Sequence, residues 1–319
     1  MSRRLLVVIG LGAALTGAGF GAYALWTAST HGEPPPPTPV FDDRGGALSS
    51  QQQFDTLAQT DPVGMLAACL TRYQREVKGG VRCTVEKQER VHGEPKHPGM
   101  PPVEVIDALI RGDVPDPETH KTAIEVLMTW KSGAKSFFGS EITGTLFSEV
   151  RHDGKVVTWR PKAILSALSS PVAPNNPLAK SQSRYCVRDA GLYRSMLRTH
   201  EAWKSRQEAG ELKVDYLGKK TPEKIGRECH VIKRICPRVE IDAFEIGGTA
   251  STDPKVVAVE GFTEVTIYID AERWLQVGTE LYRTEPDGTR VLVGAYYFRD
   301  VQLNTGFPPD AFTVEALKK

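Results

Sequence analysis

The sequence predicts an α+β fold of helices and an antiparallel sheet, with a transmembrane helix at the N-terminus. Three observations lead to this fold class: an uncharged apolar stretch near the N-terminus, a helical period at 61–78, and a long alternation of apolar and polar residues at 263–303. With 319 residues, 40% of them apolar, the chain can bury one large core. Its net charge of +1 gives no field that attracts nucleic acid, so no nucleic-acid partner is expected.

The N-terminal segment joins positive charge to a long apolar run. Arg3 and Arg4 precede residues 5–26, which contain no charged side chain. A helix of about 20 such residues spans a hydrocarbon core of about 30 Å, and the positive-inside rule places the remainder of the chain outside the cytoplasm. We expect an uncleaved inner-membrane anchor that holds the domain in the periplasm. The alternative is a signal peptide cleaved after Ala22-Tyr-Ala24, which would release the domain into the periplasm.

A proline-rich segment follows the apolar run. Residues 33–39 hold five prolines and residues 47–53 are mostly polar, a composition typical of an extended, flexible linker. We therefore expect three parts in the chain. They are an anchor or signal peptide at 1–26, a linker at 27–60 and a folded domain at 61–316.

The first predicted element of the domain is a helix at 61–78. Asp61 suits its N-cap and Pro62 suits its first turn, and apolar residues then recur at spacings of three and four. Two glycines end this helix. Residues 191–208 carry a second helical period. Each of the two helices has an apolar stripe that we expect to be buried against the sheet.

Strands are predicted between the two helices and after the second one. A hairpin at 147–160 is expected to turn at Asp153-Gly154. Residues 93–119 are rich in proline and are expected to form a long insertion that adds no strand to the sheet. Alternation of apolar and polar residues predicts the other strands, at 81–91, 123–130, 213–217 and 228–236.

The C-terminal meander at 263–303 gives the strongest strand pattern. Apolar and polar residues alternate through 265–269, and Pro286 with Gly288 indicates a tight reversal before the last strand. We expect three consecutive antiparallel strands here. Two phenylalanines in the tail that follows are expected to pack under the edge of the sheet.

The sequence contains no pattern typical of catalysis or cofactor binding. It has no Gly-rich phosphate loop, no G-x-S-x-G elbow and no H-E-x-x-H zinc motif, and its seven histidines are scattered. The five cysteines allow at most two internal disulfides, for which Cys69 and Cys83 lie on adjacent elements, or they are buried core thiols. We therefore expect a protein that is not an enzyme and has no metal site and no cofactor.

Two phrases resemble known proteins. They are CTVEKQER at 83–90 and GAYYFRDVQLN at 294–304, and they resemble an uncharacterised family of exported bacterial proteins that is similar to the periplasmic lipoprotein-carrier superfamily. The resemblance implies that the domain at 61–316 is of lipoprotein-carrier type, with a strongly curved antiparallel sheet, an incomplete β-barrel, covered by helices. In such a fold a hollow of the sheet holds an acyl chain or a hydrophobic segment of a partner. The anchor and the Pro-rich insertion depart from the carrier pattern, and a tethered protein cannot shuttle freely across a periplasm.

The ligand surface is expected among the large aromatic residues of the C-terminal meander. Tyr268, Trp274, Tyr296 and Phe298 are the candidates, although the same residues would also fill an ordinary helix–sheet core. The hypothesis is a membrane-tethered extracytoplasmic protein that binds a lipid, an acyl chain or a hydrophobic segment of a partner such as a lipoprotein. The alternative is an envelope interaction or sensor protein that docks a membrane partner without lipid transport. A hydrolase of envelope material is the least favoured reading, and no oligomeric state is predicted.

Overall fold

The computed structural model describes most of the chain beyond its N-terminal segment. The chain divides into two units, 1–37 and 38–319, and the described residues all belong to the second. The predicted anchor at 1–26 and the first part of the predicted linker, 27–49, lie outside them. No helix within the described ranges is long and apolar enough to cross a membrane. These ranges are 50–91, 101–116, 119, 122–134, 136–137, 140–161, 168 and 171–318.

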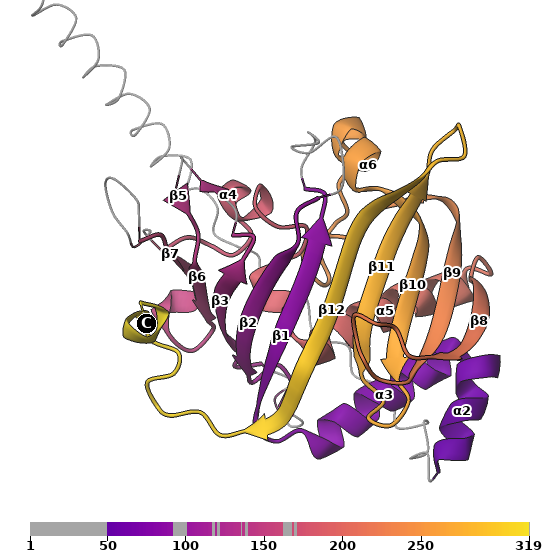
Figure 1. The fold of residues 1–319 in the computed structure, drawn as a ribbon, viewed down its shortest axis with the longest axis horizontal. Coiled ribbons are helices and arrows are strands. Elements are labelled where there is room, and N and C mark those ends of the chain that lie inside the picture. Colours follow the sequence, from indigo (N-terminus) through magenta and orange to yellow (C-terminus); the bar gives the residue numbers. More distant parts are fainter. Residues whose placement is uncertain are drawn as a thin grey trace, which may run out of the picture. The chain divides into compact units, whose positions relative to one another are not determined.

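One open, ten-stranded antiparallel sheet forms the body of the domain (Figure 1). The strands are β1 (Gly80–Glu89), β2 (Glu104–Arg111), β3 (Glu125–Ser132), β6 (Gly144–Ser148), β7 (Val156–Trp159), β8 (Lys213–Lys220), β9 (Cys229–Glu240), β10 (Phe262–Asp270), β11 (Gln276–Thr284) and β12 (Arg290–Thr305). Their order in the sheet is β7-β6-β3-β2-β1-β12-β11-β10-β9-β8, so β7 and β8 are the two edges. Each half is a meander of successive strands, and β1 pairs with β12 to join the halves in the middle. A separate ribbon pairs β4 (Ser136–Phe137) with β5 (Ser140–Glu141).

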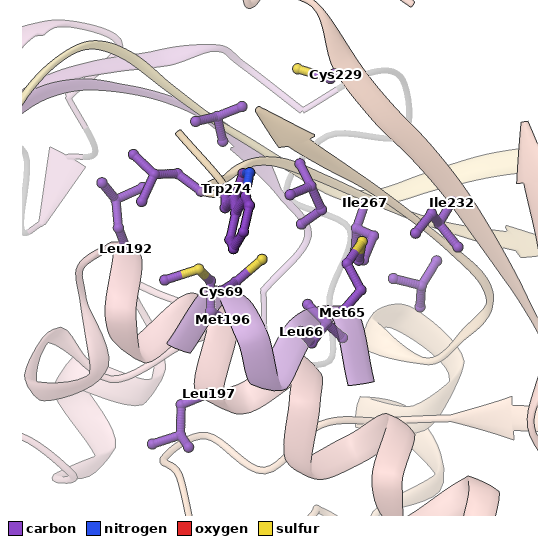
Figure 2. Close-up of a cluster of buried hydrophobic side chains, with 14 of the residues drawn as sticks. Met65, Leu66, Cys69, Leu192, Met196, Leu197, Cys229, Ile232, Ile267 and Trp274 are labelled. Carbon is purple, nitrogen blue, oxygen red and sulfur yellow. The ribbon is translucent and has the colours of Figure 1, made fainter. Parts of the chain in front are cut away.

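Three helices cover one face of the sheet, which we call the inner face. They are α2 (Gln51–Thr60), α3 (Pro62–Glu76) and α5 (Leu192–Glu208), and their buried side chains share one core with side chains of β9 to β12. Figure 2 shows side chains of α3 and α5 meeting side chains of the sheet and Trp274, which lies between β10 and β11. The predicted α+β class, with helices on an antiparallel sheet, is confirmed, and the sheet is open. The remaining helical segments are α4 (Pro177–Lys180), α6 (Pro254–Glu260), α7 (Val314–Leu317), η1 (His152–Gly154) and η2 (Val187–Asp189).

The helix predicted at 61–78 is α3, and its sequence explains where it begins. The carboxylate of Asp61 accepts a hydrogen bond from the backbone N–H of Gly64 (2.9 Å), and Pro62 occupies the first turn, where no N–H is needed. The second predicted helix is α5. The apolar stripe predicted on α3 is buried, and it consists of Met65, Leu66, Cys69, Leu70 and Tyr73.

The prediction of a strandless insertion at 93–119 is wrong in its second half, because Glu104–Arg111 is a strand of the sheet. This strand, β2, pairs with β1 on one side and with β3 on the other. Every second side chain of β2 is buried. The strand begins with an acidic residue, which disfavours strands, but the buried Glu104 carboxylate accepts a hydrogen bond from Trp130 Nε1 (2.7 Å) and lies 3.6 Å from the Lys87 ammonium group. These partners are distant in sequence, so the local pattern did not reveal them.

The predicted linker is also shorter than expected, since Gln51–Thr60 forms the helix α2. Ser50 caps this helix, and Phe54 and Ala58 are buried on its inward side. The ring of Phe54 stacks on that of Trp274, with centroids 4.1 Å apart and an angle of 5° between the planes. Two buried positions in a polar segment are too short a pattern to predict a helix, so the packing partner decides the structure here.

The C-terminal tail covers part of the opposite face of the sheet, the outer face. Phe312 is fully buried there with Leu146 and Val157 of β6 and β7. Phe307 packs edge-on against Phe312, with centroids 5.4 Å apart. The predicted packing of these two phenylalanines under the sheet is confirmed. The tail reaches only the half of the outer face that contains β3, β6 and β7.

Candidate functional site

The outer face of the other half of the sheet carries an open groove of about 570 Å³. Its walls are the end of β8 with the turn that follows, residues 217–222, and Arg290 at the start of β12. Its floor is formed by alternate residues of β9, β10 and β11. They are Val231, Lys233, Thr266, Tyr268 and Glu280.

The register of the strands explains why these side chains gather on one face. Val231 pairs with Tyr268, Lys233 pairs with Thr266, and Thr266 in turn pairs with Glu280. Paired residues of an antiparallel sheet point to the same side, and their neighbours in sequence point to the other side. The groove therefore lies on the face opposite to α2, α3 and α5.

A carboxylate between two tyrosines lies on the floor of the groove. Glu280 accepts hydrogen bonds from the hydroxyls of Tyr268 (3.0 Å) and Tyr297 (2.6 Å). Gly278 pairs with both tyrosines across the sheet, and a Cβ at this position would lie 2.9 Å from the Tyr268 ring. Burial and the nearby Glu280 carboxylate raise the pKa of both tyrosines, so both hydroxyls stay protonated and donate. The cluster fixes the orientation of the Tyr268 ring in the groove.

The basic residues of the groove differ in how they are paired. Arg290 forms an ion pair with Glu264, and its guanidinium lies over the ring of Tyr282. Lys220 and Lys233 form no ion pair with any residue in the described part of the chain. Three basic and two acidic residues line the groove in total. The unpaired ammonium groups therefore favour a ligand with an anionic group.

Exposed apolar side chains continue from the groove along the β8–β9 hairpin. In the described residues six large hydrophobic side chains are exposed, and three of them belong to this hairpin. They are Leu217 (38% exposed), Ile235 (37%) and Val239 (44%). Ile235 shares the face of Val231 and Lys233, because these residues alternate along β9. Val239 follows an irregularity in the pairing of β9 with β10 between Ile235 and Glu240. Apolar contact and positive charge thus occur together on this surface.

The four aromatic residues predicted to bind a ligand do not share one surface. Tyr268 lines the groove. The prediction assumed that Tyr268 on β10 and Tyr296 on β12 point to the same face of the sheet. In the structure Gly278 pairs with Tyr268 on β10 and with Tyr297 on β12. Tyr297, which was not predicted, is therefore the residue that shares the face of Tyr268, and only the register of the last hairpin would have revealed it. The other three predicted residues lie on the inner side, namely Trp274, Tyr296 and Phe298.

A second polar cluster lies on the inner face around Tyr296. The Tyr296 hydroxyl donates to Glu89 (2.8 Å), and the Lys87 ammonium group lies 2.8 Å from Glu89 and 3.6 Å from Glu104. Burial lowers the pKa of Lys87, but Glu104 and Glu89 raise it more, so the net shift is upward and the side chain stays charged. The charged residues at the end of β1 therefore hold β1, β2 and β12 together.

The cysteines and His230 are buried, and none of them is among the residues that line the groove. All five cysteines are free and buried, and burial raises the pKa of the Cys229 and Cys236 thiols to about 12. His230 is fully buried, with its ring nitrogens 2.9 Å from the Tyr216 hydroxyl and 3.1 Å from the Asp55 carboxylate. No group of three or more potential metal ligands occurs in the searched, described residues. The core-thiol alternative for the cysteines is confirmed.

Comparisons with known proteins give a family but no activity. No curated protein matches the chain. Two solved structures show distant likeness. A DUF1329 family protein from Desulfovibrio piger is 12% identical, with 81% of this chain and 100% of that chain covered and a TM-score of 0.37. A β-barrel-like protein of the domain of unknown function DUF1849 from Brucella abortus is 10% identical, with 70% and 98% covered and a TM-score of 0.16.

Neither of these structural likenesses supports an argument about fold or function at such scores. The resemblance of the sequence to lipoprotein carriers stays a prediction. The family comparison is different, because its match extends over both meanders of the sheet and the tail. A family model described as "Protein of unknown function (DUF1571)" matches residues 80–317, and the chain belongs to this family.

Proposed function

We propose that the chain is an extracytoplasmic binding protein, tethered to the inner membrane through residues 5–26, that accommodates a lipid, an acyl chain or a hydrophobic segment of a partner. The observation that carries this proposal is the outer-face groove, where apolar side chains lie beside lysines that form no ion pair with a described residue. Its volume of about 570 Å³ lies within the range usual for small-molecule sites.

The ligand site in this proposal differs from the one expected from sequence. Side chains of α2, α3 and α5 pack directly on the inner face, where the hollow of a carrier was expected. These helices do not cover the groove on the outer face. Leu217, Val231 and the Tyr268 ring suit the apolar part of an amphiphile, while Lys220 and Lys233 suit an anionic head group.

The test is binding of short-chain phosphatidylglycerol to purified protein by isothermal titration calorimetry. The variant Leu217→Asp places a charge on the apolar wall, and Leu178→Asp is its matched control, since Leu178 is similarly exposed (36%) on α4. The variant Lys233→Glu reverses a charge on the floor, and Lys318→Glu reverses one in the exposed tail. We expect both groove variants to weaken binding at least about tenfold and both controls to bind like the wild type. Equal binding by all five proteins would refute the site.

The alternative function is an envelope interaction or sensor protein that docks a membrane partner without transporting lipid. It is favoured by the apolar side chains of Ile235 and Val239, which extend along β9 beyond the residues that line the groove. Crosslinking from position 239 in intact cells tests it. One specific protein captured at this position, with no lipid extracted from the purified domain, would support this alternative over lipid binding.

A further inference from the structure

Arg184 is a buried cation that forms no ion pair with any residue in the described part of the structure. Its side chain is only 4% exposed, and Nε, Nη1 and Nη2 are all buried without a hydrogen-bond partner. Arg234, which is 1% exposed, provides a contrast, because its Nη2 donates to both carboxylate oxygens of Glu240 at 2.6 Å. The two buried arginines thus differ in whether the protein supplies an acceptor.

A buried arginine whose N–H groups have no hydrogen-bond acceptor is energetically unfavourable. The guanidinium group keeps its charge at any ordinary pH and carries five N–H donors in one plane. Buried donors without partners are rare in folded proteins, and the loss of a hydrogen bond to a charged group is especially unfavourable. A buried Arg184 with no acceptor is therefore a site that an anion would complete.

Burial lowers the pKa of Arg184, but the neighbouring Tyr185, Tyr296 and Asp242 raise it more, although none of them lies in hydrogen-bond geometry to its buried donors. Its Cζ lies 5.6 Å from the ring centroids of both Tyr185 and Phe262, which places aromatic faces beside the cation. The Tyr185 hydroxyl donates to Asp242 (2.5 Å), so this carboxylate already has a donor. Neither Tyr185 nor Phe262 offers a carboxylate to the guanidinium.

Tyr296 extends the same cluster toward the sheet. Its ring lies 5.5 Å from that of Tyr185, and its hydroxyl donates to Glu89. Asp242 and Glu89 are thus each hydrogen-bonded to a tyrosine, and the structure shows no ion pair between either carboxylate and Arg184. Tyr296 lies on the inner face, so this cluster is separate from the outer-face groove.

We propose that the guanidinium of Arg184 binds an oxyanion, a carboxylate or phosphate group, between Tyr185, Phe262 and Tyr296 on the inner face of the domain. The planar fork of N–H donors pairs with two oxygens of such a group at once, which a lysine in the same place would not do. The oxyanion comes either from a free small molecule or from the head group of an amphiphile, and both sources present the same chemistry to Arg184.

The test follows the stability of the wild type and of Arg184→Met as oxyanion is added, at constant ionic strength set with chloride. Inorganic phosphate is the free probe, and short-chain phosphatidic acid is the amphiphilic one. In chloride alone we expect Arg184→Met to melt at the same temperature as the wild type or higher, because the variant removes a buried charge that forms no ion pair with a described residue. With rising oxyanion the wild type alone should gain melting temperature, in a saturable way, and overtake the variant.

Calorimetric titration supplies the second measurement. Arg184→Met should bind the effective probe at least about tenfold more weakly than the wild type, and Arg184→Lys should lie between them. Arg194→Met is the control, since Arg194 is also buried (8% exposed) but donates to Thr122. It should keep the anion-dependent gain. If only one of the two probes stabilises the wild type, that probe identifies the source of the oxyanion. No saturable effect of either probe on the wild type, or an equal effect on Arg184→Met, would overturn the proposal.

Discussion

The packing of α2 on the domain gives the sharpest prediction, because one side chain, Phe54, makes much of the contact between this helix and the rest of the domain. Phe54 is fully buried and stacks face to face on Trp274. Polar bonds support this contact. Gln51 donates to the Ala271 carbonyl (2.8 Å) and accepts from Trp274 Nε1 (3.0 Å), and Asp55 contacts Lys219 (2.8 Å). We predict that Phe54→Ala releases α2 from the sheet.

The magnitude follows from burial. Truncating a fully buried phenylalanine to alanine costs about 3–5 kcal/mol, whereas each of the remaining polar bonds contributes only about 1 kcal/mol. A free helix as short as α2, which has 10 residues, is not stable in water. The variant should therefore lose α2 locally, while the core between α3, α5 and the sheet persists.

Hydrogen exchange measured by mass spectrometry tests this prediction. Amides of Gln51–Thr60 should exchange at least about 100-fold faster in Phe54→Ala than in the wild type, which corresponds to about 3 kcal/mol. Amides of α5 should change little. The control Gln52→Ala alters an exposed residue of the same helix and should leave exchange nearly unchanged. Unchanged protection of α2 in Phe54→Ala would refute the reasoning.

Three further predictions concern stability and the thiols. Burial, aided by Lys204, lowers the pKa of His200 from 6.5 to about 4, so stability is fully present above pH 6.5 and falls as pH drops toward 4. The wild type should lose about 3 kcal/mol of its free energy of unfolding between pH 7 and pH 4, measured by urea unfolding, whereas His200→Gln should not show this loss. An equal loss in the wild type and in His200→Gln would contradict the prediction. Gly278→Ala should destabilise by about 1–3 kcal/mol, because its Cβ would lie 2.9 Å from the Tyr268 ring, whereas a Cβ at Gly306 meets nothing within 4 Å and Gly306→Ala is the control. Ellman's reagent should react with none of the 5 buried thiols in the folded protein and with all 5 after denaturation in the absence of reductant. Fewer than 5 reactive thiols in the denatured protein would indicate a disulfide.

Local patterns in the sequence predicted the elements whose secondary structure is determined by residues within the element itself. The helix α3 has its own cap and stripe, and the meander of β10 to β12 has its own turns and alternation. The elements that were missed, α2 and β2, depend on contacts with distant residues. Phe54 needs Trp274, and Glu104 needs Trp130 and Lys87. Propensity and spacing within a short window contain neither of these contacts.

The candidate site was predictable only in part, for a geometric reason. A strand shows which residues alternate, but the register of its hairpin decides which of two sets shares a face with the neighbouring strand. Between β11 and β12 the register shifts at Leu281 and Tyr282. Such an irregularity is invisible in the sequence, and it places Tyr297 rather than Tyr296 beside Tyr268.

The pairing of β1 with β12 has a consequence for how the domain is made. Tyr296 and Glu89, which meet at this seam, lie 207 positions apart in the chain. Closing so long a loop costs about 5 kcal/mol of chain entropy in the unfolded state, so the local hairpins of each meander form more readily than the seam. Until β12 is complete, β1 and β11 both expose unpaired edges, the kind of surface on which strands of other molecules add. A nascent or truncated chain that lacks its last strand therefore holds two half-sheets at the stage when aggregation is easiest.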